Sequence, residues 1–254
     1  MSRSDKPITV EPAYYNRKFL DSGDGRPLRI LAEYFEPYYR LQREKIHDTI
    51  VFFGSARLTE DGPLGHYYKD AHSLARLLTE WSSSLEDSKR FVICSGGGGG
   101  IMEAANRGAA DAGGATIGFN IGLPHEQRPN PYVTPSLTFE FHYFFMRKLW
   151  FSHLARALVV FPGGFGTMDE LMETLTLAQT QKIDRQVLIL LYGSEYWKDI
   201  INFDLLAKRG MIDTKDLNLI HHVDDVQTAF ELLKNRLPRK KETACPAIAK
   251  AVFR

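Results

Sequence analysis

The sequence predicts an α/β fold: a doubly wound, Rossmann-like parallel sheet with helices on both faces. Short apolar runs alternate with longer stretches in which apolar residues recur at helical spacing. The runs are mostly apolar throughout, which is typical of parallel strands buried on both faces. Two of the runs also lead directly into glycine-rich segments. Such folds bind ligands at the carboxyl ends of their strands, so the loops after the strands are the expected location of a site.

Seven strands and six helices are expected in alternation along the middle of the chain. The strands are apolar runs of four or five residues at 49–53, 91–94, 115–119, 137–141, 158–161, 187–191 and 217–220. The helices lie between and after them, at 67–81, 101–112, 144–155, 168–181, 195–208 and 225–236. Leu74, Leu77 and Leu78 have helical spacing in the first helix, and Gly113-Gly114 closes the second. A proline-rich loop separates the third strand from the fourth.

The chain is expected to form one domain with two additions. Residues 1–47 form an N-terminal extension that is expected to be helical, 48–236 form the α/β domain, and 237–254 form a basic tail. The extension is rich in aromatic residues, and several of its apolar residues approximate one helical face. These residues are Leu28, Leu31, Phe35, Tyr38 and Tyr39. We expect a packed helix that covers the domain or a subunit interface, rather than a ligand cage built with Tyr34.

Composition excludes several classes of protein. The chain has 254 residues, 44% hydrophobic content and a net charge of +1, which argues against a disordered chain. A charge so close to zero lacks the electrostatic footprint of a dedicated nucleic-acid binder, so no nucleic-acid partner is expected. The sequence contains no stretch of about 18 apolar residues, so no membrane span is expected. Residues 1–12 show no leader pattern and the two cysteines, Cys94 and Cys245, are distant, so a cytoplasmic protein with free thiols is expected.

Two of the predicted strands run directly into glycine. The first is followed by Ser95 and then Gly96–Gly100, and the second by Pro162-Gly-Gly-Phe-Gly-Thr167. A glycine loop followed by a helix start offers free N–H groups and a positive dipole end, which suits a phosphate. Neither segment matches the dinucleotide fingerprint G-x-G-x-x-G or the P-loop. A phosphorylated ligand is therefore predicted; the alternative is that these glycines only permit tight turns and close helix–sheet packing.

Two groups of charged residues each have two interpretations. Thr167-Met-Asp-Glu170 matches the capping box S/T-x-x-E, and on pattern alone this structural role is favoured. The alternative is that Glu170 faces the ligand beside the phosphate loop. Arg147 and Lys148 lie on the predicted helix 144–155, where a solvated face is favoured. Because aromatic residues surround this pair, the alternative is that one or both cations are held in an aromatic cleft.

No metal site and no familiar nucleophile motif is present in the sequence. His221 and His222 are adjacent, so on a strand they would point to opposite faces. H-E-x-x-H, C-x-x-C and G-x-S-x-G are absent. Cys94 lies at the end of a predicted buried strand and is interpreted as a buried structural thiol. We expect no metal.

The charged pair and the second glycine loop together resemble the paired signature of the Lonely Guy (LOG) family, whose members were long labelled lysine-decarboxylase-like. That signature is an Arg-Lys pair followed by P-G-G-x-G-T-x-x-E, and here it reads Arg147-Lys148 and then Pro162–Glu170. The segments 53–57 and 96–103 are also similar to family segments. The similarity covers about 48–236, and the chain resembles a longer, bacterial-type member of the family.

The resemblance implies a phosphoribohydrolase that needs no cofactor and forms a homo-oligomer. Its substrate would be a nucleoside 5′-monophosphate, such as AMP or an N6-substituted AMP of the cytokinin type, which is split into free base and ribose 5-phosphate. The implied catalytic pair is Arg147 and Glu170. The implied substrate-binding residues are Glu126, Lys148, Gly163, Gly164, Phe165, Gly166, Thr167, Met168, Asp169 and Thr176. The other glycine loop adds Gly96, Gly97 and Gly98.

Two other functions compete with this interpretation. A non-catalytic nucleotide-binding or carrier protein would use the same phosphate loops without needing the Arg147–Glu170 pair. A pyridoxal-phosphate decarboxylase would need a Schiff-base lysine beside a phosphate loop, and Lys148 is the only nearby candidate. The chain also departs from the family at Phe144-Phe145, where members often have Met-His, and this departure bears on base preference.

Overall fold

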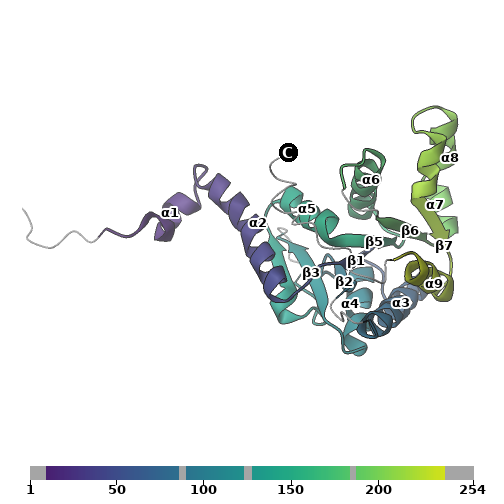
Figure 1. Ribbon diagram of the computed structural model, residues 1–254, viewed down its shortest axis with the longest axis horizontal. Helices are drawn as coiled ribbons and strands as arrows, with labels where there is room; N and C mark the ends of the chain where they lie inside the picture. The colour runs from purple at the N-terminus through teal and green to yellow at the C-terminus, as the bar shows by residue number, and fades with distance from the viewer. Residues whose placement is uncertain (1–9, 86–89, 123–127, 184–186, 238–254) are drawn as a thin grey trace, which may run out of the picture.

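The computed structural model describes residues 10–85, 90–122, 128–183 and 187–237. Its centre is a seven-stranded sheet in the order β4-β3-β2-β1-β5-β6-β7 (Figure 1). Every neighbouring pair of strands is parallel, which confirms the predicted fold class. The strands are β1 (Thr49–Phe53), β2 (Val92–Ser95), β3 (Thr116–Ile121), β4 (Thr138–Phe141), β5 (Ala155–Val160), β6 (Leu188–Tyr192) and β7 (Ile220–Val223).

Helices cover both faces of the sheet and enclose one apolar core on each face. Helices α3, α4 and α9 pack on one face, and α2, α5, α6 and α7 pack on the other (Figure 1). The α-helices are α1 (Arg17–Leu20), α2 (Arg26–Arg43), α3 (Gly65–Ser83), α4 (Ile101–Asp111), α5 (Phe144–Leu154), α6 (Phe165–Gln179), α7 (Ser194–Ile200), α8 (Phe203–Lys208) and α9 (Val226–Arg236). Short 3₁₀ helices span Ala13–Tyr15, Pro135–Leu137 and Thr214–Leu219. Among the described residues, no helix has the length and apolar content that crossing a membrane requires.

The helix predicted at 195–208 is instead two helices, α7 and α8. The chain leaves helical geometry at Ile201, and Asn202 then caps α8 by accepting a hydrogen bond from the backbone N–H of Leu205 at 2.8 Å. Asparagine is a strong N-cap residue, so a new helix begins where a continuous one was predicted.

The strand predicted at 217–220 was placed too early. Residues Thr214–Leu219 form a 3₁₀ helix that a reciprocal capping box between Asp213 and Asp216 begins. The strand β7 starts at Ile220 and therefore includes both adjacent histidines. The capping hydrogen bonds between side chains and backbone thus favour a helical turn here, although the segment is partly apolar and was predicted as a strand.

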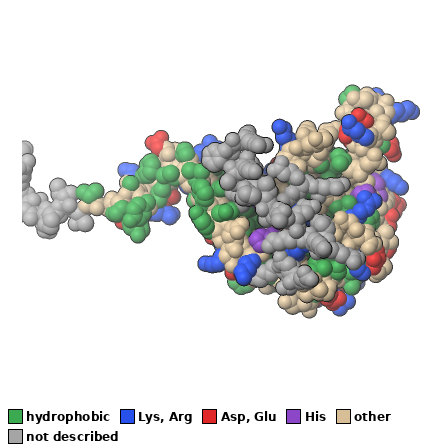
Figure 2. Space-filling view, viewed as in Figure 1, with side chains coloured by type: hydrophobic (Ala, Val, Ile, Leu, Met, Phe, Trp, Pro, Cys, Tyr) green, Lys and Arg blue, Asp and Glu red, His purple; other side chains and the backbone are tan. Residues whose placement is uncertain are grey.

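The N-terminal extension contains the expected helix, but of the predicted packing face only Tyr38 packs on the core of the domain. The side chains of α2 that pack on the core are Ile30, Tyr34, Tyr38 and Leu41. Leu28, Leu31, Phe35 and Tyr39 are between 46% and 66% exposed instead. Figure 2 shows apolar side chains on the arm that α1 and α2 form beside the domain. Helix α2 is apolar on more than one side, so the apolar pattern alone did not identify the buried face.

The strand order places a topological switch point between β1 and β5. The chain moves outward from β1 to β4 and then crosses to β5 on the other side of β1. The loops after these two strands lie together, since the N–H of Ser55 donates to the carbonyl of Pro162 at 3.0 Å. The N–H of Ile101, at the start of α4, donates to the carbonyl of Ser55 at 3.1 Å. Ligand sites of doubly wound folds lie at such points.

Candidate active site

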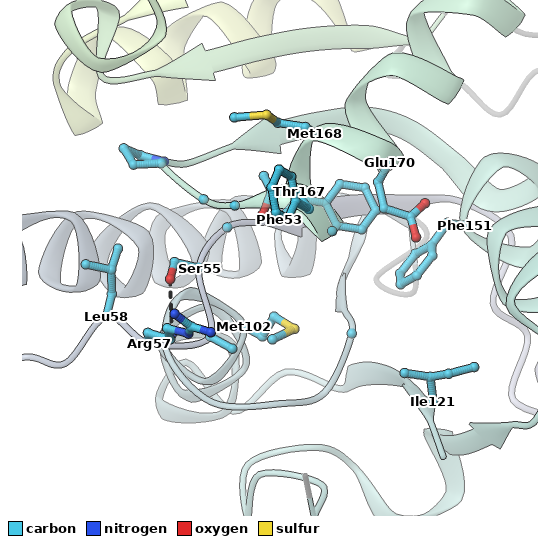
Figure 3. Close-up of a pocket in the computed structure, with 18 of the residues that line it drawn as sticks. Phe53, Ser55, Arg57, Leu58, Met102, Ile121, Phe151, Thr167, Met168 and Glu170 are labelled. Atoms are coloured by element: carbon cyan, nitrogen blue, oxygen red, sulfur yellow. Dashed lines mark hydrogen bonds between the residues drawn. The ribbon is translucent and has the colours of Figure 1, made fainter. Parts of the chain in front are cut away.

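A cavity of about 780 Å³ opens at this switch point. The loops after β1, β2 and β5, the end of β3 and parts of α5, α6 and α7 line it. Figure 3 shows Glu170 and Phe151 on one side of the cavity and Ser55 and Arg57 on another. Its volume falls within the range of about 300–1,000 Å³ that is typical of small-molecule sites.

The junction between β5 and α6 contains glycines that packing does not require. A Cβ on Gly163 would overlap the hydroxyl of Thr167, so close packing explains that glycine. A Cβ on Gly164 or Gly166 would meet no atom of the described residues within 4 Å, and neither residue has a positive φ. The turn-and-packing interpretation is therefore wrong for these two residues. Their missing side chains leave the start of α6 open, and no side chain caps that helix.

The other glycine loop is explained mainly by its own structure. Gly97 and Gly100 have positive φ values of 70° and 63°, a conformation that glycine adopts without strain. The amide of Asn130 holds this loop by donating to the carbonyl of Gly98 at 2.9 Å. Only Gly96 of the three glycines singled out from this loop lines the cavity. The loop therefore supports the cavity more than it lines it.

The capping-box interpretation of Thr167 and Glu170 is wrong. Helix α6 begins at Phe165, earlier than predicted, so Thr167 lies inside the first turn and is not the N-cap. The side chain of Glu170 points toward the cavity, and the residue is 6% exposed. The helix start was predicted too late because Thr167 matched a capping pattern, whereas Gly164 and Gly166 gave no such signal in the sequence.

Arg147 and Glu170 form a buried pair on the wall of the cavity. The guanidinium Nη2 of Arg147 lies 3.4 Å from Oε1 of Glu170, and the two side chains are 15% and 7% exposed. The guanidinium carbon also lies 5.2 Å from the ring centre of Phe144 and 5.8 Å from that of Phe151. The solvated-face interpretation is thus wrong, and the aromatic cleft is present. Within the described part of the chain, the buried Nε of Arg147 has no hydrogen-bond partner.

The surroundings of Glu170 bring its pKa close to neutral pH. Burial raises the pKa of Glu170 to about 7, while the charges of Arg147 and Lys148 oppose that rise and those of Glu173 and Asp169 add to it. Burial lowers the pKa of Arg147, and the neighbouring carboxylates partly offset this. A carboxyl group with a pKa near 7 can hold or release a proton at the pH at which an enzyme works.

Lys148 points away from the cavity into a salt-bridge cluster. Its Nζ lies 2.7 Å from Oδ2 of Asp169 and 2.7 Å from Oε2 of Glu173. Burial by itself would lower the pKa of Lys148, but the bonds to these two carboxylates raise it. The ammonium of Lys148 therefore links α5 to α6. Neither Lys148 nor Asp169 lines the cavity.

The remaining predicted residues divide between the cavity and other places. Gly163, Gly164, Phe165, Gly166, Thr167 and Met168 line the cavity. Thr176 does not, since it is exposed and its hydroxyl donates to the carbonyl of Met172 on its own helix at 2.7 Å. Glu126 lies outside the described residues. Cys94 is fully buried as expected, and burial raises its pKa well above the usual range.

Sequence reasoning missed several polar residues of the site. They are Ser55, Arg57, Asn120 and Tyr196. Ser55 and Arg57 follow a strand at the switch point, and that position was a signal that the sequence offered. Tyr196 comes from α7, and its hydroxyl donates to the carbonyl of Gly163 at 2.7 Å, a contact that no local pattern indicates. In the described ranges, no group of three or more His, Cys, Asp or Glu residues is arranged to hold a metal.

Fold and site together define an α/β protein of the Rossmann-like class with a glycine loop and a buried Arg–Glu pair at its switch point. A family model described as "Possible lysine decarboxylase" matches residues 102–233, more than half of the chain. The chain belongs to this family, which is the LOG family that the sequence resembles.

Named relatives are similar at low identity. The chain is 27% identical over 197 residues to the cytokinin riboside 5′-monophosphate phosphoribohydrolase LOG4 of Arabidopsis thaliana, covering 76% of this chain and 83% of that one. It is 24% identical over 152 residues to the cytokinin riboside 5′-monophosphate phosphoribohydrolase of Rhodococcoides fascians, covering 58% of this chain and 75% of that one.

Solved structures share the fold. A structural-genomics target superimposes with a TM-score of 0.53 at 20% identity, covering 74% of this chain and 99% of that one. The molybdenum cofactor binding protein of Rippkaea orientalis superimposes with a TM-score of 0.50 at 20% identity, covering 75% of this chain and 96% of that one. Identity at this level shows a common fold and does not distinguish an enzyme from a binding protein.

Proposed function

We propose that this protein hydrolyses the N-glycosidic bond of a nucleoside 5′-monophosphate, AMP or an N6-substituted AMP, to free base and ribose 5-phosphate. The observation that carries the proposal is the buried Arg147–Glu170 pair, which shares one cavity with the uncapped glycine start of α6. The names of the curated relatives support the same reaction class.

The 5′-phosphate would bind where α6 begins. Without side chains at Gly164 and Gly166, an anion can approach the first N–H groups of the helix, where the helix dipole also favours it. Two nearby cations are already engaged, Arg147 by Glu170 and Lys148 by the carboxylates of α6. Arg57 also lines the cavity, and it takes part in none of the salt bridges among the described residues. We assign Arg57 to the phosphate, since a guanidinium binds phosphate through two parallel hydrogen bonds.

Glu170 would act on the sugar. Cleavage of a glycosidic bond passes through an oxocarbenium-like state, which a nearby carboxylate stabilises while it orients or deprotonates water. With a pKa of about 7, the group is about half ionised at neutral pH. Arg147 keeps its proton, so its role is electrostatic and orienting: its free Nε can donate to an oxygen or nitrogen of the substrate.

A carrier and a decarboxylase would use the same cavity differently. A carrier needs the glycine loop but has no use for a buried acid that titrates near pH 7. A pyridoxal-phosphate decarboxylase needs a free lysine amine, and Lys148 is held between two carboxylates instead.

The test offers AMP, N6-substituted AMP and adenosine separately to the purified protein and separates the products by chromatography. We expect free base and ribose 5-phosphate from at least one monophosphate, and release from adenosine at least about a hundredfold slower because the phosphate supplies binding energy used in catalysis. Monophosphates that bind and are recovered intact would identify a carrier and reject the hydrolase.

A further inference from the structure

A glutamate of the N-terminal extension is bonded to the helix that carries Arg147. Glu33 lies in α2, and its Oε1 accepts a hydrogen bond from the backbone N–H of His142 at 2.8 Å. Its Oε2 accepts one from the N–H of Tyr143 at 3.2 Å. The indole Nε1 of Trp150 donates to the backbone carbonyl of Glu33 at 3.1 Å. One residue of the extension therefore contacts α5 at its start and again near its middle.

These contacts supply what α5 lacks. The N-cap of α5 is Tyr143, whose side chain makes no capping bond. In a capping box, a Glu three positions into the helix accepts the N–H of the N-cap residue. Glu33 does the same from a different helix, and its negative charge lies at the positive end of the α5 dipole. Tyr34, the next residue of α2, packs on Trp150 with ring centres 5.8 Å apart.

Arg147 lies between the two points that Glu33 holds. Its backbone N–H donates to the carbonyl of Tyr143 at 3.2 Å, so it belongs to the first turn that Glu33 fixes. At the other end of the side chain, Nη2 is 3.4 Å from Glu170, at the long limit of a hydrogen bond. A small rotation or shift of α5 would therefore break the contact between Arg147 and Glu170.

We propose that Glu33 is a positioning residue: by fixing the start of α5, it holds Arg147 against Glu170. The contact between the helices stands on its own geometry, whereas its importance for turnover rests on the proposed hydrolase function. The N-terminal extension is then part of the support of the active site and more than a cover for the domain.

A change in the position of α5 can be measured at Glu170. Four charged groups act on this carboxyl, Arg147 and Lys148 from α5 and Asp169 and Glu173 from α6. The α5 cations hold its pKa down and the α6 acids push it up. Burial is the largest cause of the raised pKa, and α5 helps to bury the carboxyl. If α5 loses its anchor, both the burial and the position of Arg147 change, and the pKa of Glu170 shifts away from about 7.

The experiment measures the pKa of Glu170 by NMR titration of side-chain ¹³C-labelled glutamate in the full chain, with the signal assigned from Glu170→Gln. We expect Glu33→Ala to shift this pKa and Glu33→Gln to shift it less, because one carbonyl oxygen still accepts. The control is Glu36→Gln, which removes a carboxylate of the same helix that is exposed and contacts Arg40. It should leave the pKa unchanged.

A double-mutant cycle tests whether Glu33 acts through the α5 cation. In an Arg147→Gln background, Glu33→Ala should change the pKa of Glu170 much less than in the wild type, since the main cation is already gone. Equal changes in both backgrounds would overturn the proposal. In the hydrolase assay, Glu33→Ala should lower kcat/KM about tenfold or more at pH 7, as a misplaced catalytic group does.

The outcomes separate this proposal from the hydrolase proposal. A folded Glu33→Ala protein with an unchanged pKa at Glu170 would show that Glu33 is merely structural, even if its thermal stability falls. If Glu33→Ala does not fold, the isosteric Glu33→Gln decides by the same readout. If the wild type releases no base but the pKa pattern holds, the hydrolase proposal fails and the positioning role stands.

Discussion

Replacing Glu170 with glutamine should remove a loss of stability that the wild type undergoes as pH rises toward neutrality. The pKa of this buried carboxyl is about 7 in the folded protein, against an ordinary value of 4.5. The folded protein therefore holds the proton more tightly than the unfolded chain between these values. The stabilisation is fully present below about pH 4.5 and is lost as pH rises through 7.

The size of the effect follows from this interval. At about 1.4 kcal/mol for each pH unit, the gap between 4.5 and about 7 corresponds to about 3 kcal/mol of unfolding free energy. Glutamine does not titrate, so Glu170→Gln escapes the loss. The difference in unfolding free energy between Glu170→Gln and wild type should move in favour of the variant by about 2–3 kcal/mol from pH 5 to pH 8.

Urea unfolding of both proteins at pH 5, 6, 7 and 8, followed by circular dichroism, measures this difference. The exposed Glu36→Gln variant is the control and should follow the wild type. A difference that stays constant over this range would show that the Glu170 carboxyl ionises as easily in the folded protein as in the unfolded chain. A difference that moves in favour of the wild type would show that attraction to Arg147 outweighs burial. Either result refutes the reasoning.

Two further predictions concern the phosphate end of the cavity. Gly166→Ala should keep the unfolding free energy or raise it by up to about 1 kcal/mol, while weakening AMP binding. Gly100→Ala should lower the unfolding free energy by about 2 kcal/mol or more, because Gly100 has a positive φ and the carbonyl of Ser55 lies close to it. Equal stability losses in urea unfolding would restore the packing explanation for Gly166. Arg57→Gln should raise the Kd of AMP about tenfold in titration calorimetry, because a charge-assisted hydrogen bond to the phosphate is lost. The Kd of adenosine should stay unchanged. An equal loss of affinity for AMP and adenosine would show that Arg57 does not bind the phosphate.

The sheet and its strands other than β7 could be predicted from the sequence because strands buried on both faces are apolar nearly throughout. The loop after β5 was also expected at a ligand site, since parallel strands all end at one edge, and it lines the cavity; the loop after β1 lines it too but was not predicted. The start of α6 was predicted too late, at 168 instead of Phe165, because Gly164 and Gly166 mark no cap while Thr167 imitates one. A glycine that neither a turn nor close packing requires has no local signature of its own.

The long-range contacts of the site could not be predicted. The family signature points to Arg147 and Glu170, but local patterns favoured a solvated face and a capping box. Burial decides between these alternatives, and burial depends on α5 and α6 meeting across the cavity. The contact between Glu33 and Tyr143 joins residues 110 apart in the chain, so no spacing in the sequence announces it.

The rate of adenine release from AMP by wild type and by Glu170→Gln, measured from pH 5 to pH 9, tests the central claim most directly. We expect the wild-type rate at subsaturating AMP to rise with pH through about 7, as Glu170 loses its proton. Glu170→Gln should remain folded and be slower by at least about a hundredfold. A wild-type protein that binds AMP and releases no adenine at any pH, or a Glu170→Gln variant as fast as wild type, would contradict it.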